Sequence, residues 1–179
     1  MKIQLALPFL LIGIVILGPK FQNQNRGEVF LGNKLTELES YFKYRDSLDP
    51  NISQVPVAWH LDHSLRTINE IYRAMKKSNP KEYKGSIHLG RSMLLLTNRI
   101  PRGRAEAPKI VTPPDTISTD SLYLHLNEAW INLSTYDSLP KKAFFEHPYL
   151  GKLKKKTAKK FIEIHTEHHL KIIRDILKK

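Results

Sequence analysis

The sequence predicts an all-α protein, an antiparallel four-helix bundle preceded by an N-terminal hydrophobic anchor helix. Apolar residues recur every three to four positions in four long segments, whereas no segment alternates with a period of two and no internal repeat is found. Proline and glycine cluster between these segments, where connections are expected. A chain of 179 residues, 41% hydrophobic and 26% charged, is typical of one folded domain.

The first twenty residues read as a targeting segment. Lys2 precedes an apolar stretch from Leu5 to Gly18, which is followed by Pro19 and Lys20. Its length lies between a signal-peptide core and a full span of about 20 residues. Because no clear small-residue cleavage site follows, we favour an uncleaved signal anchor with the domain outside the cytoplasm; a cleaved signal peptide and an exported soluble protein are the alternative. Residues 1–20 are therefore assigned to targeting and 21–32 to a linker.

The remaining residues, 33–179, form the predicted bundle domain. The first helix begins near Asn33 and ends before Asp49-Pro50, and the second begins after Ser53, with Pro56 in its first turn, where proline is tolerated. A proline- and glycine-rich loop, IPRGRAEAPKIVTPPDT, precedes the third helix. The predicted helices cover 33 to 49, 54 to 77, 118 to 136 and 153 to 177, with a shorter one at 87 to 98.

Composition excludes several kinds of site. The chain has no cysteine, so disulfides, thiolate metal ligands and a cysteine nucleophile are all ruled out. A formal charge of +12 is compatible with nucleic acid, anionic lipid or an anionic substrate. The densest basic run, Lys152 to Lys160, contains no aromatic residue and lies in no nucleic-acid-binding motif. We therefore expect no nucleic-acid partner, and we expect a solvated basic surface near a membrane.

Two histidines of the last helix carry the functional hypothesis. At about 100° per residue, His165 and His169 lie on the same apolar stripe as Phe161, Ile172 and Ile176. Two imidazoles on a core-facing stripe are costly unless both rings find partners, since a buried unpaired polar group costs about 1 to 3 kcal/mol. A shared divalent metal ion satisfies both, because an i, i+4 spacing brings the two rings to one ion.

A third ligand should come from a facing helix. His60 is best placed, because it flanks the apolar stripe of the second helix, whereas His63 turns about 60° the other way. His168 also points away from the centre of its helix, and His125 lies at the margin of the third-helix stripe. We assign these last two as weaker, outer-shell candidates.

Three motifs resemble the DinB/YfiT-like superfamily of metalloproteins. They are VAWHLDHSL near the start of the second long helix, the loop FFEHPYLGKL and IHTEHHLKII in the last helix. In particular, the chain looks like a DinB-like branch whose members end in an HP-x-x-G-x-L loop followed by an H-x-x-H-H helix. The resemblance covers about residues 34 to 179.

The resemblance implies a four-helix bundle with a three-histidine metal site at one end. Carried over by motif, the ligands are His60, His165 and His169, and the ion is zinc, nickel or iron. Characterised members of the superfamily look like low-molecular-weight thiol S-transferases, so the resemblance implies a metal-dependent transferase or hydrolase with an open coordination position. A non-catalytic, membrane-anchored metal- or ligand-binding module is the alternative.

The loop before the third helix suggests the substrate class. Arg102 and Arg104 are weak candidates for receiving an anionic small molecule at the mouth of the site. An ordinary solvated connection is the alternative interpretation of this loop. The expected partners are thus a small-molecule substrate and, through the N-terminal segment, a membrane; a homodimer is left open.

Overall fold

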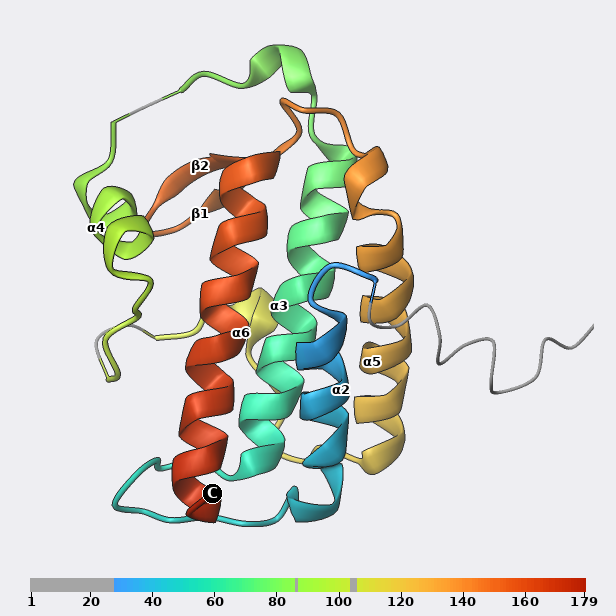
Figure 1. Ribbon diagram of the computed structural model, residues 1–179, viewed down its shortest axis with the longest axis vertical. Helices are drawn as coiled ribbons and strands as arrows, with labels where there is room; N and C mark the ends of the chain where they lie inside the picture. The colour runs from blue at the N-terminus through green and yellow to red at the C-terminus, as the bar shows by residue number, and fades with distance from the viewer. Residues whose placement is uncertain (1–27, 86, 104–105) are drawn as a thin grey trace, which may run out of the picture.

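The computed structural model describes residues 28–85, 87–103 and 106–179. This part of the chain is mostly helical, with a small two-stranded sheet. Helices α2 (Gly32–Ser40), α3 (Val57–Lys77), α5 (Thr119–Ser134) and α6 (Lys155–Leu177) lie side by side along the long axis, and α4 (Leu89–Thr97) lies apart from them (Figure 1). None of the described helices is long and apolar enough to cross a membrane. The predicted anchor at residues 1–20 lies outside the described residues.

Helix α3 is the central element of the fold. It packs against α5 on one side and α6 on the other. Its first turn is held by the preceding loop, because the backbone N–H groups of Val57 and Ala58 donate to the carbonyls of Ser47 and Arg45. Both apolar and polar residues of α3 are buried, which follows from its having neighbours on two sides.

The helices do not alternate strictly in direction. Figure 1 shows α3 running opposite to α2 and α6, whereas α3 and α5 run the same way. A connection of about 40 residues, which includes α4, returns the chain to the end at which α5 begins. Two bundle helices that follow one another along the chain can run parallel only if a long crossover joins them. The expectation of a simple antiparallel arrangement therefore fails for the α3–α5 pair.

A β-hairpin precedes α6, and the prediction of a purely helical fold is incomplete for this reason. Strands β1 (Phe144–His147) and β2 (Gly151–Lys154) pair antiparallel, with Phe145 opposite Leu153. These two side chains are buried in the core, and Gly151 closes the turn with a φ of 68°. Because each strand has four residues, its inward and outward positions are too few to show a period of two.

Candidate metal centre

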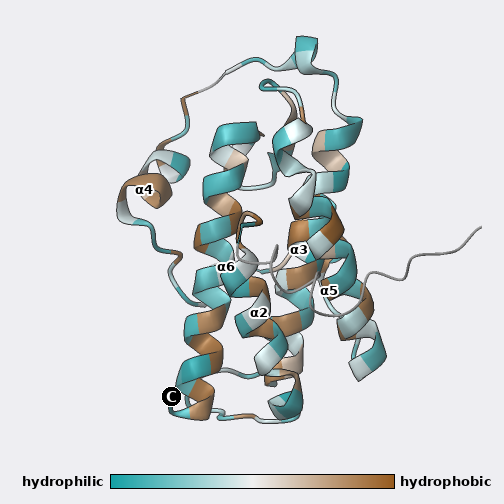
Figure 2. Ribbon diagram, turned by 45° about the vertical axis from the view of Figure 1, so that its right-hand side comes forward, coloured by the Kyte–Doolittle hydropathy of each residue, from teal (hydrophilic) through white to brown (hydrophobic). Residues whose placement is uncertain are grey.

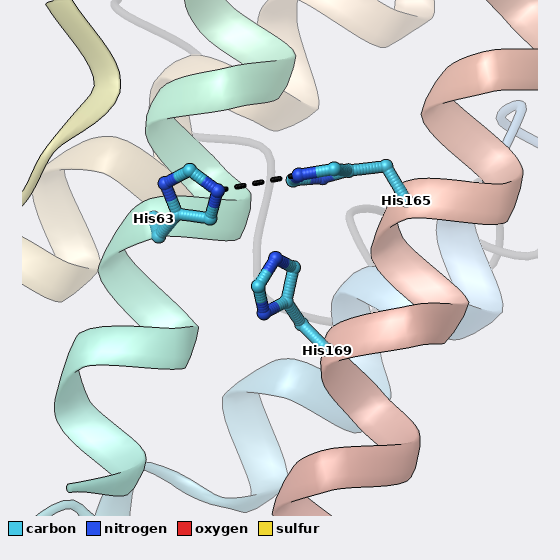
Figure 3. Close-up of side chains that lie close together, drawn as sticks. All are labelled: His63, His165 and His169. Carbon is cyan, nitrogen blue, oxygen red and sulfur yellow. Dashed lines mark hydrogen bonds between the residues drawn. The ribbon is translucent and has the colours of Figure 1, made fainter. Parts of the chain in front are cut away.

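Three histidines from two helices converge inside the fold. His63 projects from α3, and His165 and His169 project from α6, with their rings facing one another (Figure 3). The Nε2 atoms of His63 and His165 lie 3.2 Å apart, and ligand atoms of all three residues lie within 4.8 Å of one another. His63 and His169 are buried and His165 is partly exposed. Histidine nitrogens bound to one zinc ion, each about 2.0 to 2.1 Å from it, lie about 3 to 4 Å apart.

The expected pair on α6 is therefore found together, but with a different third residue. His63 occupies the place that helical phase gave to His60, and the expectation that His63 turns away is wrong. Both histidines are buried, 4% and 5% exposed, because α3 has neighbours on two sides. Because the buried face of α3 is this wide, helical phase alone does not distinguish His60 from His63, which lie one turn apart.

The loop before α5 orients His63. The Nδ1 atom of His63 lies 2.9 Å from the carbonyl oxygen of Val111, which belongs to a short 3-10 helix at Lys109–Val111. A carbonyl only accepts, so Nδ1 carries the hydrogen and Nε2 presents a lone pair towards His165. Trp59 stacks on the same ring, with centroids 4.7 Å apart and planes 21° from parallel. Carbonyl and indole together hold this ring in place.

His60 contacts the cluster from outside. Its Nδ1 lies 3.1 Å from Nδ1 of His169, and its Nε2 lies 2.9 Å from Oγ of Ser53. Both of its nitrogens thus already have partners. Ser53, Trp59 and Val111 were not identified from the sequence, since a serine in a loop, a tryptophan before a histidine and a backbone carbonyl carry no motif.

The five histidines at this place are held neutral. Burial, followed by the neighbouring histidines His63 and His168 and by Arg102, lowers the pKa of His60 to about 3. Burial is also the main cause that lowers the pKa of His63 and that takes the pKa of His165 and His169 well below its ordinary value. For His168, burial and Arg102 lower the pKa to about 4. Neutral imidazoles are the form that binds metals.

The two outer-shell candidates lie in different surroundings. His168 packs edge-on against His169, with centroids 5.0 Å apart. His125 is directed elsewhere: its Nδ1 lies 2.7 Å from Oδ1 of Asp62, between α3 and α5. His125 therefore contacts a buried carboxylate, and no contact between it and the three clustered rings is found among the described residues.

A pocket of about 300 Å³ lies beside His168, between α6 and the segment after α4. Its lining includes Arg99, Arg102 and Lys171, and one carboxylate, that of Glu167. Arg102 also pairs with Asp175 at 2.6 Å, and Glu167 is bonded to Lys34 and Arg174. Arg102 thus lines a pocket beside His168, and Arg104 lies outside the described residues.

Comparison with known proteins adds nothing to this geometry. No family model, no curated protein and no solved structure matches the chain.

Proposed function

We propose that the protein binds one divalent metal ion through His63, His165 and His169 and uses it as a catalytic centre. The observation that carries the proposal is the convergence of three neutral, mostly buried imidazoles from α3 and α6. A shift of about an ångström in the ring positions would bring all three nitrogens to the separations that a zinc-like ion requires.

The same geometry supports a revised form of the family resemblance. We propose that α2, α3, α5 and α6 form a DinB-like four-helix bundle, with one ligand from α3 and the H-x-x-x-H pair from α6. The third ligand moves by three residues, from His60 to His63, and remains on the same helix. The second histidine of VAWHLDHSL then takes the role that the first was expected to have.

Three neutral ligands would leave the charge of the ion uncompensated and at least one coordination position open. Such an ion lowers the pKa of bound water towards about 7 and polarises a carbonyl or phosphoryl oxygen. The nearby carboxylates of Asp62 and Glu167 are already bonded to cationic side chains. We therefore favour metal-bound hydroxide as the attacking group, which corresponds to a hydrolase, over a transferase that needs a separate base.

The substrate class follows from the charges around the centre. The pocket at Arg99, Arg102 and Lys171 carries three cations against the single carboxylate of Glu167. Together with the ion, this surface would attract an anionic small molecule. The thiol-transferase version is less suited to a protein exported by its N-terminal segment, because low-molecular-weight thiols are chiefly cytosolic.

A non-catalytic metal-binding module is the second candidate. The observation in its favour is that Nδ1 of His60 lies 3.1 Å from His169. If His60 turned to the ion as a fourth ligand, the site would be closed, which is typical of structural zinc.

Metal analysis of the full-length chain, purified in mild detergent, tests the proposal. We expect one equivalent of metal in the wild type and none in the triple variant His63→Ala, His165→Ala, His169→Ala, with His168→Gln as the matched control. Cobalt substitution followed by azide addition then separates the two candidates. An open site changes its absorption spectrum on binding azide, whereas a closed four-histidine site does not.

Localisation is tested separately. We propose that residues 1–20 anchor the protein in a membrane, and alkali-washed membranes should retain it. A mature protein that begins near residue 20 in the soluble fraction would contradict the anchor.

A further inference from the structure

We infer that His60 and Ser53 form a hydrogen-bonded relay that fixes the tautomer and orientation of the metal ligand His169. The inference rests on the proposed metal site and assigns roles to two residues that the ligand set leaves out. The relay assigns its donors and acceptors in order from its outer end, where Ser53 contacts a backbone carbonyl.

The outer end lies in the loop before α3. The hydroxyl of Ser53 donates its one hydrogen to the carbonyl of Val55 at 3.1 Å and accepts from the N–H of Val55 at 3.2 Å. With its hydrogen on this carbonyl, Ser53 accepts from His60, 2.9 Å away. The relay assigns the hydrogen of this bond to Nε2 of His60.

The second step passes through the ring of His60. A neutral imidazole has one hydrogen, so a hydrogen on Nε2 leaves Nδ1 as an acceptor. Nδ1 of His169, 3.1 Å away, must then donate to it. His60 is 4% exposed, so little water competes for these bonds.

The last step reaches the centre. With the hydrogen of His169 on Nδ1, its lone pair is on Nε2, and Figure 3 shows one nitrogen of this ring facing the pair formed by His63 and His165. Metal-bound histidines commonly donate their other N–H to a second group, which fixes the ring and makes it more basic. The carbonyl of Val111 does this for His63, and the relay does it for His169.

Histidine tautomers can be measured without any metal. In the metal-free protein, ¹⁵N NMR of the imidazoles should find the hydrogen on Nε2 of His60 and on Nδ1 of His169. The opposite tautomer at either ring would overturn the relay. A wild type that binds no metal would refute the proposed centre but leave this measurement decisive for the relay.

Substitutions measure its effect on the ion. His60→Leu removes the acceptor and should weaken zinc binding about 10- to 100-fold. His60→Asn, which offers an oxygen near the position of Nδ1, should restore much of the affinity, and Ser53→Ala should have a smaller effect. The cobalt spectrum should stay that of a three-histidine site in all of them.

Two results would overturn this role. Zinc affinity unchanged in both His60→Leu and Ser53→Ala would mean that the relay does not act on the ion. A loss as complete as in His169→Ala, with a changed cobalt spectrum, would make His60 a direct ligand. His168→Gln is the control, because His168 also contacts His169 but is not part of the relay.

A separate observation concerns α4, which presents an exposed apolar face. Leu89, Met93 and Leu96 follow one another at i, i+4 and i+7 and are 77%, 55% and 82% exposed, and Ile87 just before them is fully exposed. The opposite side of α4 is hydrogen-bonded to the β-hairpin, because Arg91 donates to the carbonyls of Leu150 and Lys152. Figure 2 shows the apolar residues on this outlying helix.

We propose that this face lies on the surface of an anionic membrane. Residues 87–103 contain no acidic residue, and the chain carries a formal charge of +12, so this region does not repel an anionic surface. An exposed apolar helix face on a basic protein is typical of helices that lie in the bilayer interface. Helix α4 stands apart from the other helices, so its exposed face is open to a flat surface (Figure 1).

The chain has no cysteine, so a fluorophore can be placed at one position of the full-length protein. A label at Met93→Cys should shift to the blue and become shielded from an aqueous quencher on vesicles containing phosphatidylglycerol. It should change less on neutral phosphatidylcholine vesicles. A label at Ile131→Cys, an exposed position on α5, should stay accessible to the quencher.

Two outcomes would overturn this placement. The label at residue 93 could remain accessible in protein that is bound to anionic vesicles, so that α4 does not touch the lipid. Alternatively, it could become shielded without vesicles as protein concentration rises, which would make the face a contact between two copies.

Discussion

Helix α3 buries polar side chains on two sides, and the two sides differ in how those groups are satisfied. Towards α5, Asp62 is fully buried and accepts from His125 at 2.7 Å and from Arg66 at 2.5 Å. Asn69 and Asn132 also bond to each other there. Towards α6, the Nε2 atoms of His63 and His165 lie 3.2 Å apart, and a ligand atom of His169 lies within 4.8 Å of both residues.

The polar groups on the α5 side of α3 stabilise the fold, whereas those on the α6 side form the proposed metal site. On the α5 side both carboxylate oxygens of Asp62 have donors from the protein. On the α6 side the nitrogens of three neutral imidazoles converge, which is an arrangement that can hold a cation. If the two sides are independent, substitutions on the α5 side should change stability and leave zinc affinity almost unchanged.

The largest effect is expected from the proposed ligands. Replacing His63, His165 or His169 singly with alanine should weaken zinc binding at least about 1000-fold, because each removes one of three bonds to the ion. Competition with a chromophoric chelator measures the affinity. The Asp62→Asn variant should bind zinc with an affinity within about threefold of the wild type. A large loss of zinc affinity in that variant would show that the two sides of α3 are coupled.

The next effect concerns stability. Asp62→Asn should lower the free energy of unfolding by about 2 to 3 kcal/mol, since it leaves the guanidinium of Arg66 beside a neutral, buried amide. Urea unfolding followed by circular dichroism, in the presence of a chelator, measures it. A loss under 0.5 kcal/mol, on the order of an exposed ion pair, would contradict the structural role.

The two sides should also respond to different ranges of pH. His147 packs against Phe161 of α6, and burial, followed by His88, lowers its pKa to about 4. Between its ordinary pKa and about 4 the unfolded chain takes up a proton that the folded chain does not, so stability falls as the pH falls through this range. Thermal unfolding of the metal-free protein should show this fall, and His147→Gln should make it shallower.

Asp62 contributes in the same direction but over a lower range of pH. Burial alone would raise its pKa, but the bonds from His125 and Arg66 outweigh burial and hold the pKa below its ordinary value. Its contribution is present at neutral pH and is lost only as the pH falls through that lowered pKa. The difference in unfolding temperature between wild type and Asp62→Asn should therefore persist at pH 5, and its disappearance there would contradict the assignment.

The smallest effect belongs to the pocket. Replacing Arg102 and Lys171 with alanine should weaken binding of a small anion such as phosphate about 3- to 10-fold and leave the metal content unchanged. Isothermal titration of the zinc-loaded protein measures this. A parallel loss of metal would mean that these residues support the centre itself.

The sequence predicted the helices and half of the centre. The spacing of His165 and His169 on an apolar stripe is a local property of one helix, and the structure places them together. The choice between His60 and His63 depends on which neighbour faces which side of α3, and that is a tertiary property. The carbonyl of Val111 comes from a loop 48 residues away from His63, and no side-chain pattern indicates it.

The division of the proposed ligands between two helices has a consequence for the denatured state. His165 and His169 are four residues apart, so one turn of nascent helix can already hold an ion, whereas His63 joins only after folding across 102 residues. Metal bound by the unfolded chain does not stabilise the native one, and only the difference in affinity does. Zinc should therefore raise the unfolding temperature by less than its affinity for the native protein implies, and the shortfall measures how much of the site survives in the unfolded chain.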